Sequence, residues 1–99
     1  MRDDVPTTII VHFHSKPDKV DELRDFIMPA IPRLRELTGC LGGSLYHDMQ
    51  EPNLFVLVEH WESSTDHQTY IDQIEQDGTM DRMRPLLARE PDRRYLSEV

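Results

Sequence analysis

The chain has 99 residues, of which 11 are basic and 19 are acidic, and its formal net charge at pH 7 is −8. This length accommodates one domain, which we expect to occupy residues 1–99 with its core in residues 7–96. The negative charge excludes binding along a nucleic-acid backbone, which requires Lys and Arg, and docking on an anionic membrane surface. It also disfavours a strongly anionic substrate.

The first predicted elements are a strand and a helix. The strand covers Thr7–His14, which is rich in β-branched residues. Apolar side chains then recur at helical spacing from Val20 to Leu37, which predicts a helix with one apolar face. Pro29 and Pro32 lie inside this pattern and lack a backbone N–H, so we expect a kink or a break into two pieces.

A strand–turn–strand unit is predicted next. Its strands cover Leu41–Gln50 and Leu54–Trp61, and Glu51–Asn53 forms the turn between them. The segment Leu54–Val58 is apolar on both faces of the pleat, although the helices of such a fold cover only one face. We therefore expect a homodimer in which a second copy packs on the open sheet face. The alternative is a monomer that tolerates an exposed apolar surface.

The remaining elements complete a β-α-β-β-α-β order. Ser63 and its polar neighbours provide caps for a helix that ends near Gly78, and Thr79 caps a further short helix. The last strand is predicted over Pro91–Leu96. This order predicts an α+β fold, the ferredoxin-like split βαβ arrangement with an antiparallel sheet.

The single cysteine, Cys40, excludes an intrachain disulfide and a Cys-rich zinc site. The chain starts with charged residues followed by Pro6, a pattern unlike a signal peptide, and no apolar run approaches the roughly 20 residues of a membrane span. We therefore expect a cytoplasmic location.

Three of the five histidines could approach one another on the sheet. His12 and His14 share a face of their strand, and His60 lies on another strand that could be adjacent. Such a set could bind Zn, Fe or Cu, but no carboxylate or cysteine has the spacing to complete it. We therefore expect no metal site, with these histidines hydrogen-bonded or solvated.

The end of the Leu54–Trp61 strand places a carboxylate beside a tryptophan on an apolar face. Strand alternation puts Glu59 and Trp61 on the same side as Leu57. Because burying an unpaired carboxylate is costly, Glu59 could belong to a pocket wall. It could equally be paired with Arg84 or Arg94.

Aromatic and imidazole side chains are predicted around the same region. His67 and Tyr70 share a face of the helix after Trp61, and Tyr46 lies on the neighbouring strand. Apolar walls with a few hydrogen-bonding groups suit a flat phenolic ligand. The sequence contains no phosphate-binding loop and no dinucleotide fingerprint, so no cofactor is expected.

The chain resembles the antibiotic biosynthesis monooxygenase (ABM) domain family. The resemblance extends from Thr7 to about Leu96 and depends on Thr38-Gly39-Cys40, on the strand that ends in Glu59-His60-Trp61, and on the order of the elements. It implies a dimeric α/β barrel, in which two ferredoxin-like subunits pack through their sheets. It also implies cofactor-independent oxidation of phenols or quinols, in which the deprotonated substrate itself activates dioxygen.

The resemblance assigns Trp61 to the substrate pocket, and Leu57 stands where some of these oxygenases carry an asparagine. Haem degradation, another activity of the family, is disfavoured because the first strand lacks its asparagine and the helix after Trp61 has Tyr70-Ile71 where a histidine is needed.

The resulting hypothesis is a monooxygenase that oxidises a small phenolic or quinol substrate with dioxygen. The alternatives are a non-catalytic dimeric module that binds or senses a small hydrophobic ligand, and an isomerase or lyase that uses the same pocket. The base would be His67 or His12, with Glu59 orienting or polarising the substrate. The residues expected to line the substrate site are Trp61, Tyr70, Tyr46 and Leu57.

Overall fold

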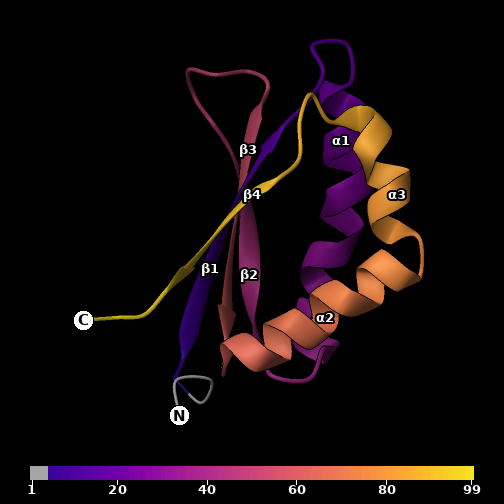
Figure 1. Cartoon of the computed structure of the whole chain (residues 1–99). Helices are drawn as coiled ribbons and strands as arrows, with labels where there is room; N and C mark the ends of the chain where they lie inside the picture. The colour runs from indigo at the N-terminus through magenta and orange to yellow at the C-terminus, as the bar shows by residue number, and fades with distance from the viewer. Residues whose placement is uncertain (1–4) are drawn as a thin grey trace.

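The computed structural model describes residues 5–99 (Figure 1). In chain order its strands, α-helices and 3₁₀ helices (labelled η) are β1 (Thr7–His14), α1 (Val20–Ile27), η2 (Met28–Glu36), β2 (Cys40–His47), β3 (Leu54–Trp61), α2 (Ser64–Gln76), α3 (Thr79–Met83), η3 (Arg84–Leu86) and β4 (Asp92–Leu96). This order confirms the predicted α+β ferredoxin-like fold.

The four strands form one antiparallel sheet in the order β2-β3-β1-β4. In the register of the central pair, Val11 lies opposite Leu57 and His12 lies opposite Val56. Residues opposite each other in an antiparallel pair point to the same face, so odd-numbered residues of β1 and β3 share one face. All helices of residues 5–99 lie against this face, called the inner face below, and none of them covers the other, outer face (Figure 1).

The core lies between the inner face and the helices. Alternate residues of β1 and β3 are buried there, as the period of two requires. Leu23 and Ile27 of α1 and Leu34 of η2 pack against them. Met80 of α3 is also buried in this core.

The predicted break in the first helix occurs at Met28. Upstream of it α1 is α-helical, whereas the nine residues of η2 form a 3₁₀ helix that contains Pro29 and Pro32. Each proline lacks the donor that an α-helix needs and crowds the preceding turn. The tighter 3₁₀ geometry keeps the segment helical and allows Leu34 to reach the core.

Several predicted boundaries shift by a few residues, and two of these shifts have a local reason. Strand β2 ends at His47 rather than at Gln50, because the Asp48 carboxylate accepts the N–H groups of Gln50 (2.8 Å) and Glu51 (2.7 Å) and turns the chain. Thr79 is the first residue of α3 rather than its cap, and its N–H donates to the Asp77 carboxylate (2.9 Å).

Gly39 allows the turn after η2 to approach the start of α2. Its φ of +80° lies in the left-handed region, and a Cβ at this position would collide with the Asp66 side chain. The Gly39 carbonyl accepts the N–H of Glu62 (2.7 Å). This hydrogen bond connects the residue after β3 to the residue before β2. No helix within residues 5–99 has the length and apolarity to cross a membrane.

Candidate functional site

A cavity of about 560 Å³ lies between the inner face of the sheet and the helices. Its volume falls in the range of small-molecule sites. Most of its lining is apolar and comes from β1, β3, α1, η2, α2 and α3. Its polar and ionisable lining residues are Arg33, Glu36, Glu59, His67, Tyr70, Thr79, Arg82 and Arg93.

Glu59 is a buried carboxylate in the wall of this cavity. Strand alternation turns it inward between Leu57 and Trp61, and only 3% of its surface is exposed. The indole N–H of Trp61 donates to Oε1 of Glu59 (3.0 Å). Burial raises the pKa of Glu59, while the Trp61 hydrogen bond and the charge of Arg93 act in the opposite direction.

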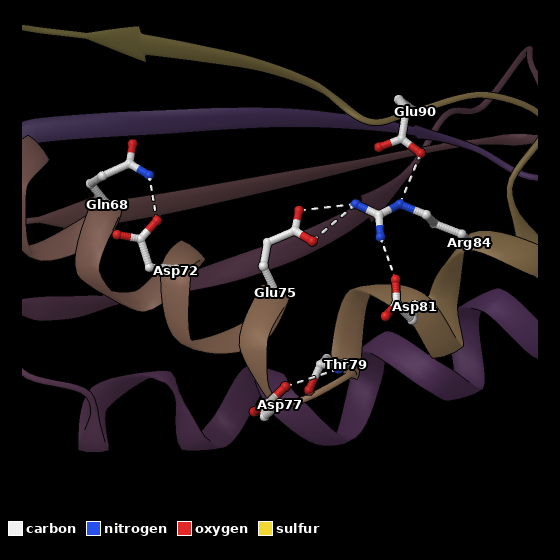
Figure 2. Close-up of polar contacts among 8 residues, drawn as sticks. All are labelled: Gln68, Asp72, Glu75, Asp77, Thr79, Asp81, Arg84 and Glu90. Atoms are coloured by element: carbon white, nitrogen blue, oxygen red, sulfur yellow. Dashed lines mark hydrogen bonds and ion pairs between the residues drawn. The ribbon is translucent and has the colours of Figure 1, made fainter.

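Neither arginine considered as a partner for Glu59 contacts it. Figure 2 shows that Arg84 instead binds the carboxylates of Glu75, Asp81 and Glu90, at 2.9, 2.7 and 3.0 Å. Arg94 lies opposite Ile10 and therefore points to the outer face. Glu59 belongs to the pocket wall.

His67 faces Glu59 from the first turn of α2. Ser63 caps this helix, its Oγ accepting the Asp66 N–H (3.1 Å), which orients the first turn over the sheet. Nε2 of His67 lies 3.6 Å from Oε1 of Glu59, just beyond hydrogen-bond distance. Nδ1 lies 3.2 Å from the hydroxyl oxygen of Tyr95. His67 is 1% exposed, and burial lowers its pKa to about 4, assisted by the charge of Arg93.

Aromatic rings enclose the Glu59–His67 pair. Trp61 makes an edge contact with His67 (ring centroids 5.2 Å apart) and a tilted contact with Tyr70 (5.7 Å). Tyr70 lines the cavity, and burial, followed by the nearby Glu59 charge, raises its pKa to about 12. Trp61 is 1% exposed and does not line the cavity; its indole instead contacts Glu59 through the hydrogen bond described above.

Arg93 is a cavity residue that the sequence did not indicate. It is half-buried on β4 opposite Val11, on the inner face, and its charge acts on Glu59, His67 and Tyr70. Arg33 and Arg82 also line the cavity. Three arginines and two glutamates therefore line the cavity, so its lining does not share the excess of acidic residues of the whole chain.

The structure brings together five of the seven residues proposed for the site. Four of them line the cavity, namely Leu57, Glu59, His67 and Tyr70, and Trp61 contacts the last three of these.

The other two residues lie elsewhere on the sheet. His12 pairs with Val56 and lies on the outer face, where Nδ1 is 3.9 Å from Asp92. Tyr46 also pairs with Val56 and is 57% exposed. The structure therefore does not place either residue in the cavity.

The three histidines considered for metal binding are not arranged as a ligand set. His12 and His14 make an edge contact with their ring centroids 6.5 Å apart. His60 instead contacts the Thr8 hydroxyl, with Nδ1 3.2 Å from Oγ1. Within residues 5–99, no three His, Cys, Asp or Glu side chains are grouped to hold a metal ion.

The fold is a ferredoxin-like α+β domain with a cavity of about 560 Å³ between the sheet and the helices. The family model of the antibiotic biosynthesis monooxygenases (ABM) matches residues 6–73, more than half of the chain. The chain therefore belongs to the ABM family, as the sequence resemblance predicts. No curated protein matches the sequence.

Solved structures share this fold over nearly the whole chain. Rv0793 from Mycobacterium tuberculosis is 22% identical, with a TM-score of 0.82 and 95% of each chain covered. A conserved protein from Methanosarcina mazei Go1 is 16% identical, with a TM-score of 0.83, and the match covers 97% of this chain and 95% of that one. A protein described as an antibiotic biosynthesis monooxygenase is also 16% identical, with a TM-score of 0.81 and coverages of 94% and 98%. At these identities the likeness shows the fold alone.

Proposed function

We propose that the protein is a cofactor-independent monooxygenase that oxidises a small phenolic or quinol substrate with dioxygen. The observation that carries this proposal is the Glu59–His67 pair, buried at the wall of a largely apolar cavity. A buried carboxylate with a raised pKa is a suitable base for a phenolic proton, because base strength follows pKa. Membership of the ABM family supports the reaction class.

Glu59 is the base in this proposal, and His67 is its partner. Burial changes the two pKa values in opposite directions, so at neutral pH His67 is neutral and a weaker base than the Glu59 carboxylate. Arg93 provides the positive charge that stabilises the phenolate as it forms. Leu57 and Tyr70 confine the ring of the substrate.

The proposed reaction balances without a further reductant. Glu59 removes the phenolic proton, and the phenolate transfers one electron to dioxygen. The resulting radical and superoxide combine at a ring carbon that carries hydrogen, which forms a C–O bond. The peroxide takes the proton back from Glu59. The ring carbon that carries the hydroperoxide then loses its hydrogen as a proton while the O–O bond breaks, and this carbon becomes a carbonyl group. One oxygen atom enters the product and the other leaves as water, whose hydrogens come from the substrate O–H and C–H.

Oxygen uptake tests this proposal. The purified protein is assayed in an oxygen electrode with a panel of quinols and naphthols, beside Glu59→Gln and the control Glu62→Gln. The amide introduced by Glu59→Gln can still accept the Trp61 hydrogen bond but cannot remove a proton, so uptake should fall about 100-fold, whereas the exposed Glu62 should be dispensable.

No uptake with any compound of the panel would contradict the monooxygenase. If compounds of the panel raised the melting temperature without turnover, the binding module would be the better description, because binding stabilises the native state by mass action.

We also propose that two copies associate through their outer sheet faces. Ile10, Val56 and Val58 lie next to one another at the centre of that face, half-buried and with no helix over them. A second copy would cover this apolar surface. Sedimentation velocity should give a dimer for the parent chain and a monomer for Val58→Lys, with Glu62→Lys as the control. A monomeric parent at micromolar concentration would contradict the dimer.

A further inference from the structure

Tyr95 connects the surface of the molecule to the buried polar pair. It lies on β4 opposite Ile9, on the inner face of the sheet, and its hydroxyl oxygen is 3.2 Å from Nδ1 of His67. Tyr95 is 47% exposed whereas His67 is 1% exposed. His67 lines the cavity and Tyr95 does not, so Tyr95 contacts His67 from outside the cavity.

The contact can form in two ways, and each has a different consequence for Glu59. If the Tyr95 hydroxyl donates to Nδ1, the imidazole proton is on Nε2 and faces Oε1 of Glu59. If Nδ1 carries the proton and donates to Tyr95, the lone pair of Nε2 faces the Glu59 oxygens. The first arrangement attracts an ionised carboxylate, and the second repels it.

The hydrogen bond from Trp61 favours the first arrangement. Its indole N–H already donates to Oε1 of Glu59 at 3.0 Å, so this oxygen acts as an acceptor. A second N–H directed at the same oxygen from His67 completes an environment for an anion.

We propose that Tyr95 is a positioning residue whose hydroxyl donates to Nδ1 of His67, holds the imidazole in the Nε2–H tautomer and so directs an N–H at the Glu59 carboxylate. This inference rests on the proposed role of Glu59 as the base. Tyr95 acts through His67 and touches neither the substrate nor the reacting atoms.

Three other ionisable groups lie around the pair. Arg93 on β4 favours ionised Glu59, whereas Tyr70 on α2 and Cys40 on β2 are neutral at pH 7 because burial raises the pKa of both. Removing the Tyr95 hydroxyl leaves all three in place. A change in Glu59 ionisation in Tyr95→Phe would therefore report on His67.

Nitrogen NMR of ¹⁵N-histidine-labelled protein tests the tautomer without any substrate. The ring-nitrogen shifts of His67, assigned by comparison with His67→Gln, should show the Nε2–H form in the parent chain. Tyr95→Phe should add the Nδ1–H form, whereas Tyr46→Phe, the same change at an exposed tyrosine of the outer face, should leave the spectrum unchanged. An Nδ1–H parent, or a Tyr95→Phe spectrum identical to the parent, would overturn the proposal.

The pH dependence of oxygen uptake tests the consequence for Glu59. Loss of the Nε2–H contact should raise the pKa of Glu59, so the acid limb of the kcat profile should move up by about one pH unit in Tyr95→Phe. KM should stay unchanged, and kcat should recover at higher pH. An equal loss of kcat at every pH would indicate a merely structural role and overturn the proposal. The NMR result stands even where no compound is oxidised, so failure of the proposed function is distinguishable from failure of this inference.

Discussion

Neighbouring residues of β3 meet two different environments. Phe55, Leu57, Glu59 and Trp61 are buried under the helices, whereas Leu54, Val56 and Val58 are half-buried on the open face and His60 is exposed. Every second residue of one strand therefore contributes to the core and the cavity, and the residues between them form a surface that can meet another molecule. The two-residue period of β3 thus separates the proposed catalytic side chains from the proposed dimer surface within eight residues.

The largest expected difference between the two faces is in stability. Phe55→Ala should lower the free energy of unfolding by about 3–5 kcal/mol, because it leaves a cavity in a packed core. Val56→Ala removes a half-buried side chain and should cost about 1 kcal/mol in a monomer. Urea denaturation measures both variants. If the outer face is an interface, the Val56→Ala effect should grow with protein concentration; equal effects at both positions would contradict the two environments.

The buried histidine should make stability depend on pH. His67 has an ordinary pKa of 6.5 that falls to about 4 in the folded chain, so between these values the unfolded chain binds a proton that the folded chain does not. Stability should therefore be complete above pH 6.5 and should fall by about 3 kcal/mol as the pH decreases to 4. His67→Gln should remove this loss, while His60→Gln, on the outer face, should keep it. Denaturation midpoints measured at several pH values test this prediction. The same pH dependence in His67→Gln and His60→Gln would contradict the assignment of the loss to His67.

Two adjacent arginines of β4 offer a matched test of the electrostatics. Arg93 faces the cavity and Arg94 faces outward. Arg93→Met should weaken binding of a phenolate-forming ligand about tenfold, because a charge-assisted contact is lost, whereas Arg94→Met should leave it unchanged. Calorimetric titration above the pKa of the ligand measures the difference. Equal affinities for the two variants would contradict a role of Arg93 in ligand binding.

The smallest effect is expected from the ion pairs around Arg84. This side chain links carboxylates from α2, from α3 and from the segment before β4 (Figure 2), but all of them are accessible to solvent and screened by salt. Arg84→Met should lower the melting temperature slightly at low salt and not at 1 M salt, where the screening length is about 3 Å. Thermal melts at both salt concentrations test this; a loss as large as that of Phe55→Ala would contradict it.

The sequence predicts most of the fold because alternation and proline act locally. Strands β1 and β3 have the predicted bounds, and the break in the first helix follows from its two prolines. Alternation within β3 also predicts that Glu59 and Trp61 share the buried face.

The positions of His12, Tyr46 and Arg93 depend instead on strand register. His12 and Tyr46 both pair with Val56, which turns them away from Glu59, and this pairing cannot be deduced from either strand alone. Arg93 and Tyr95 lie on a short polar strand whose alternation carries no apolar signal. The contribution of β4 to the site becomes visible only when its register against β1 is known.

The 3₁₀ geometry of η2 has a consequence for how the cavity could change during evolution. In a 3₁₀ helix, side chains three residues apart line up, so Ile31 and Leu34 form a ridge on one side of η2, and both side chains line the cavity. This ridge belongs to a different element from the strand and the helix that carry Glu59 and His67. Substitutions at every third residue of η2 would therefore widen or narrow the cavity while the polar pair keeps its geometry, so ligand size and reactivity can diverge independently within one chain.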